Sequence, residues 1–212
     1  MTTGSNSTLT SAQTWNARFA VDSYLFGTEP NSWLRQNAES WKAGSHILCV
    51  ADGEGRNSVW LAQQGHRVDA FDISDHAVDK AKRLAKQRNV HVNFAVAGCD
   101  DFAWPQDQYD GVAAIFVQFN DPVQRRRLFD RIVGCLKPGG IFVLLGYTPK
   151  QVEYRTGGPS DVSHLYTPEL LQDELSMLDI QVLKEFEEIL DEGTAHSGPS
   201  ALIGLVGARR KK

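Results

Sequence analysis

Cysteine is scarce in this 212-residue chain, which contains only three, at Cys49, Cys99 and Cys135. They are widely spaced and odd in number, which argues against both a disulfide framework and a cysteine-rich zinc site. Such a set is typical of a protein kept in a reducing cytoplasm, and we expect that location. The six histidines are scattered without paired ligand spacing, so we expect no metal site.

Long hydrophobic runs are also missing, since none approaches the ~18 residues of a membrane-spanning helix. We therefore expect no membrane association. Positive charge is not in excess: 22 Lys and Arg stand against 26 Asp and Glu, for a net charge of −4. Only the end of the chain, residues 209–212, is strongly basic, so nucleic acid is an unlikely partner. The first 14 residues lack the pattern of a signal peptide, and we expect residues 1–11 to be a disordered tail.

The chain does contain a strand–turn–helix pattern around residues 47–57. A short apolar run leads into the turn Gly53-Glu54-Gly55, and a helical pattern follows. The glycines let the backbone approach a ligand closely, and the helix offers unpaired N–H groups beside them. Asp72 ends the next apolar run about 20 residues further on, where a carboxylate can accept hydrogen bonds from a ribose. This combination predicts a cofactor that carries a nucleoside.

Apolar segments alternate with helical patterns over the first two thirds of the chain. The expected strands are 46–50, 67–72, 92–97, 111–116 and 141–145. We expect helix caps at Thr28, Ser74, Asp121 and Thr167. Most of the strands are apolar throughout, which is typical of a parallel sheet covered on both faces. Two extended stretches, 180–190 and 201–208, are joined by the turn-rich link 191–200 and predict an antiparallel pair.

At this point the chain resembles a class I S-adenosylmethionine-dependent methyltransferase over residues 12–209. The Gly53-x-Gly55 turn with Asp72, the break at 137–140 and the closing extended pair carry the resemblance. Segments 26–31, 53–57, 157–159 and 192–198 are similar to the bacterial tellurite-resistance methyltransferase-like branch. The resemblance implies an α/β fold: a doubly wound, Rossmann-like seven-stranded sheet, mostly parallel with the last strand antiparallel, and helices on both faces. It also implies S-adenosyl-L-methionine as cofactor, a single domain over 12–209 and a basic tail at 210–212.

The resemblance implies cofactor contacts at the carboxyl ends of the strands. Carried over by position, they are Ala51, Asp52, Gly53, Glu54, Gly55, Asp72, Ile73, Asp100, Asp101, Phe102, Phe116 and Val117. Two positions depart from the family: Cys49 replaces an acidic residue and Ala51 a glycine. We therefore expect Asp52 or a backbone carbonyl to hold the amino group of the cofactor.

A small-molecule acceptor should lie beyond the ends of the later strands. We expect the N-terminal arm, residues 12–42, and the irregular stretch 147–166 to close over it. The substrate-binding candidates are Tyr24, Glu29, Tyr147, Arg155, Tyr166 and His196. Each of them could instead be a packing or solvated residue, and no catalytic residue is assigned beyond the candidates Tyr24 and His196.

The acceptor itself is left open. A soft nucleophile, such as a thiol or a selenium or tellurium oxyanion, needs little help from a base, since a free thiol has a pKa of about 8.5. The alternatives are an O or N acceptor, RNA, or a catalytically silent module that binds S-adenosylmethionine. A nicotinamide dehydrogenase is disfavoured because Ser58 stands where a third glycine is required. We expect a monomer or a homodimer.

Overall fold

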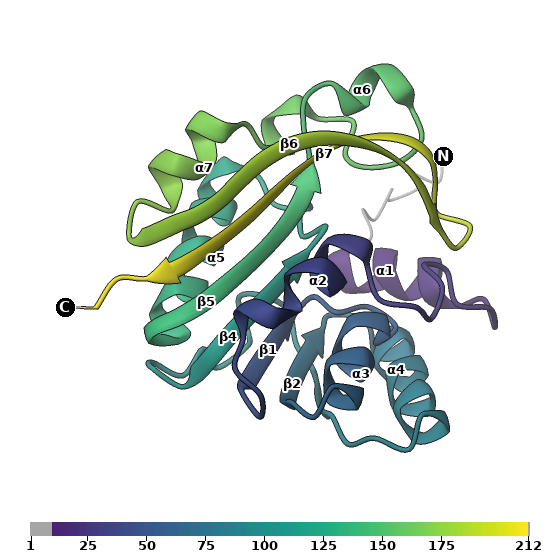
Figure 1. Ribbon diagram of the computed structural model, residues 1–212. Coiled ribbons are helices and arrows are strands. Elements are labelled where there is room, and N and C mark those ends of the chain that lie inside the picture. Colours follow the sequence, from purple (N-terminus) through teal and green to yellow (C-terminus); the bar gives the residue numbers. More distant parts are fainter. Residues whose placement is uncertain (1–9, 212) are drawn as a thin grey trace, which may run out of the picture.

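The computed structural model describes residues 10–211, which form one seven-stranded sheet with helices on both faces (Figure 1). The strand order is β3-β2-β1-β4-β5-β7-β6. The strands are β1 (His46–Val50), β2 (Arg67–Asp72), β3 (Asn93–Val96), β4 (Tyr109–Ile115), β5 (Leu136–Tyr147), β6 (Leu178–Glu192) and β7 (His196–Arg209). β7 pairs antiparallel with both β5 and β6, and the other pairs of neighbouring strands are parallel. The expected doubly wound, mostly parallel sheet is confirmed.

The helices divide between the two faces, and each face has its own apolar cluster. On one face α5 (Pro122–Cys135) and α7 (Pro168–Glu174) pack against the sheet. On the other face lie α2 (Ser32–Asn37), η1 (Ala38–Ser40), α3 (Arg56–Gln63) and α4 (Asp75–Gln87). Three short elements remain: α1 (Ser11–Phe19), which packs on α4, together with α6 (Gln151–Tyr154) and η2 (Val162–His164). Among residues 10–211, no helix is both long and apolar enough to cross a membrane.

Local capping chemistry fixes most of the helix starts. Ser74 accepts a hydrogen bond from the amide of Ala77, and Asp121 forms a full capping box in front of α5. Thr167 caps α7 in the same way. The expected cap at Thr28 is wrong, because α2 begins four residues later with Asn31 as its N-cap.

The connections also differ in detail from the expectation. Residues 97–108 join β3 to β4 by turns alone, without a helix. The β6–β7 link is only three residues long, because both strands extend into the stretch 191–200. Most of the expected disordered tail falls on residues 1–9, outside the described part of the chain. Thr10 is the N-cap of α1 and Ser11 its first residue.

The sheet changes its direction of winding between β1 and β4. From β1 the chain proceeds to β2 and β3 on one side, and from β4 to β5 on the other. In open α/β sheets, ligands bind at such a switch point, beyond the carboxyl ends of the strands. The fold therefore places the turn that follows β1 at the position where a ligand is expected.

Candidate active site

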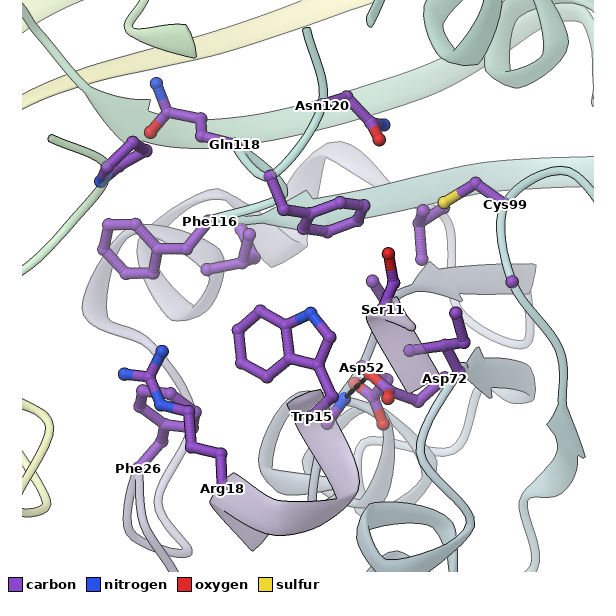
Figure 2. A pocket seen from close by; sticks show the side chains of 18 of the residues that line it. Ser11, Trp15, Arg18, Phe26, Asp52, Asp72, Cys99, Phe116, Gln118 and Asn120 are labelled. Atoms are coloured by element: carbon purple, nitrogen blue, oxygen red, sulfur yellow. Dashed lines mark hydrogen bonds between the residues drawn. The ribbon is translucent and has the colours of Figure 1, made fainter. Parts of the chain in front are cut away.

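A cavity of about 770 Å³ opens at this switch point. Its floor is formed by the ends of β1, β2 and β4, and its walls by α1, the loop before α2, residues 157–164 and the start of β7. In Figure 2, Trp15 extends from α1 into the middle of the cavity, with Asp52 and Asp72 on one side and Gln118 and Asn120 on the other. This volume is within the range of small-molecule and cofactor sites.

Asp72 stands at the end of β2 and holds the glycine turn after β1. Its Oδ2 accepts a hydrogen bond from the amide of Gly53 at 2.9 Å, and its Oδ1 accepts one from Ser74 at 2.9 Å. A carboxylate has about four acceptor positions, so both oxygens keep capacity for a ligand hydroxyl. Burial raises the pKa of Asp72, although these amide bonds act against the shift.

Asp52 is the second carboxylate on this side of the cavity. It accepts hydrogen bonds from the hydroxyl and the amide of Ser58, in the first turn of α3. Burial raises the pKa of Asp52 to about 7, even though the bonds to Ser58 lower it. No cation pairs with Asp52 or Asp72 among the described ion pairs. A ligand that brings positive charge would stabilise both ionised forms.

Two residues of the turn lie outside the cavity and have packing roles instead. Glu54 is buried in an ion pair with Lys80, with Oε1 and Nζ 2.7 Å apart, and also accepts the amides of Leu25 and Phe26. Gly55 faces α4, where an added Cβ would lie 2.7 Å from that of Ala81. The expectation that Glu54 and Gly55 line the pocket is corrected, because each holds another part of the chain in place.

The other expected cofactor residues also divide into two groups. Those in the cavity wall are Ala51, Asp52, Gly53, Asp72, Ile73, Asp100, Asp101 and Phe116. Phe102 and Val117 lie outside it. Phe102 stacks on Phe71 with ring centroids 4.2 Å apart, and Val117 is buried in the core. For the eight residues in the cavity wall, a role in binding the cofactor remains a prediction.

Only two of the expected substrate residues, Tyr147 and His196, line the cavity. Tyr24 turns away and donates its hydroxyl to the carbonyl of Lys80 at 3.1 Å. Glu29 is exposed and pairs with Arg88, and Tyr166 is buried beneath β5. Arg155, exposed after α6, is not part of the wall either. The structure places these four residues outside the cavity, which corrects the expectation that they line it.

His196 is the better placed of the two catalytic candidates. Its ring lies 4.5 Å from the ring centroids of both Phe26 and Phe116. Its Nδ1 is 3.5 Å from Glu192 Oε2 but has no hydrogen-bond partner in the described part of the chain. Burial lowers the pKa of His196 and outweighs the carboxylate of Glu192, which raises it. The imidazole is therefore neutral at pH 7.

Several wall residues did not follow from the sequence, and one group of them comes from α1. Trp15, Arg18 and Phe19 all come from this helix. The helix is fixed to the cofactor side of the sheet because the hydroxyl of Ser74 donates to Asn16 Oδ1 at 2.5 Å. The dense aromatic residues of the N-terminal arm were the available signal, but they do not reveal which ones face the cavity. Gln118, Phe119 and Asn120, which follow β4, were also missed.

A methyltransferase domain family matches residues 47–140, from β1 to the beginning of β5. Residues 47–140 therefore belong to this domain family, and the comparisons support a class I S-adenosylmethionine-dependent methyltransferase. Its cofactor is S-adenosylmethionine.

An S-adenosyl-L-methionine-dependent Diels-Alderase of Talaromyces variabilis is 31% identical over 173 residues, which is 79% of this chain and 54% of the relative. The chain thus spans about half the length of the curated relatives it matches.

Two solved structures show the same fold. One was described for the conversion of a disulfide bond into a thioacetal group during echinomycin biosynthesis. It has a TM-score of 0.77 at 15% identity and covers 94% of this chain and 92% of its own. The other, TehB from Haemophilus influenzae, has a TM-score of 0.68 at 14% identity, and the match covers 94% of this chain and 67% of TehB. At these identities the likeness concerns the fold alone.

The residues present fit S-adenosylmethionine. The cofactor carries a sulfonium and an ammonium group, and Asp52 and Asp72 are two carboxylates on the same side of the cavity without a cation partner. Asp72 keeps acceptor capacity for ribose hydroxyls. The Cys49 thiol cannot supply the negative charge of the acidic residue usual at its position, because burial holds the pKa of Cys49 well above the ordinary value. Asp52, three residues further on, is the carboxylate nearest in sequence to Cys49 and is the candidate to hold the amino group of the cofactor.

Proposed function

We propose that this protein transfers the methyl group of S-adenosylmethionine to a small-molecule acceptor inside the cavity. One observation carries the proposal. Asp72 and the Gly53 turn line the same cavity as Tyr147 and His196, and Trp15 extends into its middle. The first group suits the nucleoside of the cofactor, and the second suits an acceptor.

Methyl transfer requires the protein to position the acceptor rather than to supply a strongly reactive catalytic group. The bound cofactor supplies an activated methyl group, and the protein holds the acceptor in line with it. Alignment of this kind contributes roughly 7–11 kcal/mol to lowering a barrier. Asp72 would hold the ribose and Asp52 the amino group, while the aromatic walls exclude water. The volume of the cavity favours a small molecule over a folded RNA.

A soft nucleophile, such as a thiol or a selenium or tellurium oxyanion, remains our preferred acceptor. Asp72 and Asp52 would be occupied by the ribose and the amino group of the cofactor, so neither would be available as a base for the acceptor. His196 is neutral and could take a proton from an O or N acceptor, which keeps that class as the alternative.

The test is turnover to S-adenosylhomocysteine with a panel of small thiols, selenite, tellurite, phenols and amines. Formation of S-adenosylhomocysteine and the methylated product together supports methyl transfer. Binding of the cofactor in calorimetry without turnover on any acceptor would instead support the silent binding module.

A second function is favoured by one comparison. The relative that matches 79% of this chain is a Diels-Alderase, and the cavity has apolar aromatic walls formed by Trp15, Phe26 and Phe116. Such a cavity could fold a polyene for cyclisation around a cofactor that is not consumed. Cyclised product from a diene substrate without formation of S-adenosylhomocysteine would identify this activity.

A further inference from the structure

The two ends of the cavity differ in charge. Asp52 and Asp72 give the cofactor end negative charge, whereas Arg18 and Arg56 line the end near the N-terminal arm. Figure 2 shows Arg18 beside Phe26 and well separated from the two carboxylates. Arg56 is neutralised by Glu192, with Nη2 and Oε2 2.8 Å apart. Arg18 therefore carries the uncompensated positive charge at the end of the cavity near the N-terminal arm.

Arg18 is an exposed residue whose guanidinium lies over two aromatic rings. Its guanidinium carbon lies 5.1 Å from the ring centroid of Trp15 and 5.6 Å from that of Phe26. Among the ion pairs and hydrogen bonds described for residues 10–211, none involves its side chain. Aromatic contact orients the planar group while leaving its N–H donors available, which suits recognition of a carboxylate or another oxyanion.

Tyr147 adds a second donor to the wall of this cavity. Its hydroxyl is buried and has no hydrogen-bond partner among residues 10–211. Its ring stacks on Phe116 at 4.7 Å, and a Cβ added to Gly158 would lie 2.8 Å from that ring. The hydroxyl is 3.6 Å from the position of a Cβ on Gly157, so the backbone of this glycine lies beside it. Burying a hydroxyl without a hydrogen-bond partner is unfavourable, and a ligand that accepts its hydrogen bond would remove this cost.

Three other ionisable groups of the cavity wall leave the charge of Arg18 uncancelled. His196 is neutral because burial lowers its pKa. Asp161 also lines the cavity, but its side chain is 65% exposed and accepts the amide of Ser163. Burial raises the pKa of Tyr147, which keeps its hydroxyl protonated and able to donate.

We propose that the methyl acceptor is an anion whose carboxylate, or comparable oxyanion, is bound by the Arg18 guanidinium and the Tyr147 hydroxyl. The inference rests on the proposed function and specifies its substrate class. The cationic cofactor and the anionic acceptor then occupy opposite ends of one cavity, and each end carries the complementary charge.

The test measures binding of matched probes to the full-length protein saturated with S-adenosylhomocysteine. Calorimetry compares mercaptoacetate with 2-mercaptoethanol and benzoate with benzyl alcohol, with selenite as an inorganic oxyanion. We expect the anionic member of each pair to bind about tenfold or more tightly, as for other charge-assisted hydrogen bonds. Arg18→Gln should remove most of this preference, and Tyr147→Phe should reduce it. Arg35→Gln, which removes an exposed arginine on α2, is the matched control and should leave it intact.

Equal binding of anionic and neutral probes, or an anion preference that survives in Arg18→Gln, overturns the proposal. S-adenosylhomocysteine binding by Arg18→Gln, with an unchanged melting temperature, verifies that the variant is folded. Failure of the proposed function has a different signature: Arg18-dependent anion binding persists, but no acceptor yields a methylated product. Methyl transfer that prefers neutral acceptors in the wild type would sink the anion proposal alone.

Discussion

Replacing Glu192 by glutamine probes the cluster that joins the β6–β7 hairpin to α3 and to the N-terminal arm. Its carboxylate accepts hydrogen bonds from Arg56 Nη2 and Asn31 Nδ2, both at 2.8 Å, and lies 3.5 Å from His196 Nδ1. Burial alone would raise the pKa of Glu192. The three neighbouring side chains outweigh burial and hold the pKa at about 2.

The size of the effect follows from this pKa. A fall from the ordinary 4.5 to about 2 corresponds to about 3 kcal/mol at roughly 1.4 kcal/mol per pKa unit. Because the folded-state pKa is depressed, this stabilisation is fully present above the unfolded pKa of 4.5 and is lost as pH falls toward 2. Glutamine cannot ionise, so Glu192→Gln should reduce the free energy of unfolding by about 3 kcal/mol at neutral pH.

Urea unfolding of wild type and Glu192→Gln, between about pH 7 and pH 3, measures this difference. The gap between the two proteins should narrow as the solution becomes more acidic than about pH 5. Asp191→Asn, at the exposed neighbouring position, is the control and should stay within about 0.5 kcal/mol of wild type. A gap that is constant over this range, or smaller than about 1 kcal/mol at neutral pH, would refute the assignment of a buried, strongly paired carboxylate.

Three further predictions concern single side chains. Asp72→Ala should weaken S-adenosylhomocysteine binding by about 1.5–3 kcal/mol in calorimetry; unchanged affinity would mean that the ribose is held elsewhere. Gly55→Ala should lower the free energy of unfolding by about 2–3 kcal/mol, because the added Cβ would lie 2.7 Å from that of Ala81 at a φ of +89°; a wild-type urea midpoint would contradict this packing role. Tyr166→Phe should leave thermal stability unchanged or higher, because the buried hydroxyl has no partner; a lower melting temperature would reveal one.

The parts of the fold that could be predicted from the sequence are those set by local chemistry. Ser74, Asp121 and Thr167 cap their helices through hydrogen bonds to amides two or three residues away. The start of α2 could not be predicted in this way. Asn31 is held by Asn57 and by Glu192, which are distant in the sequence, and Thr28 has equally suitable cap chemistry.

The same distinction applies to the site. Gly53 and Asp72 were predictable because the spacing of two adjacent parallel strands brings them together, and their hydrogen bond follows from it. Arg18 was not, since its place depends on where α1 packs. Tyr24 and Tyr166 were misplaced because residue type alone does not tell which way an aromatic side chain points from an irregular segment.

The segments of the methyltransferase resemblance form one unit in three dimensions. Leu25, just before segment 26–31, donates its amide to Glu54 of the turn at 2.7 Å, and its carbonyl accepts the amide of Ala195 at 3.3 Å. The hairpin glycine Gly193 is so close that a Cβ would lie 2.5 Å from this carbonyl. Backbone contact without side chains between them requires a glycine here. The arm therefore joins the turn after β1 to the hairpin that carries His196, so one loop positions both ends of the cavity.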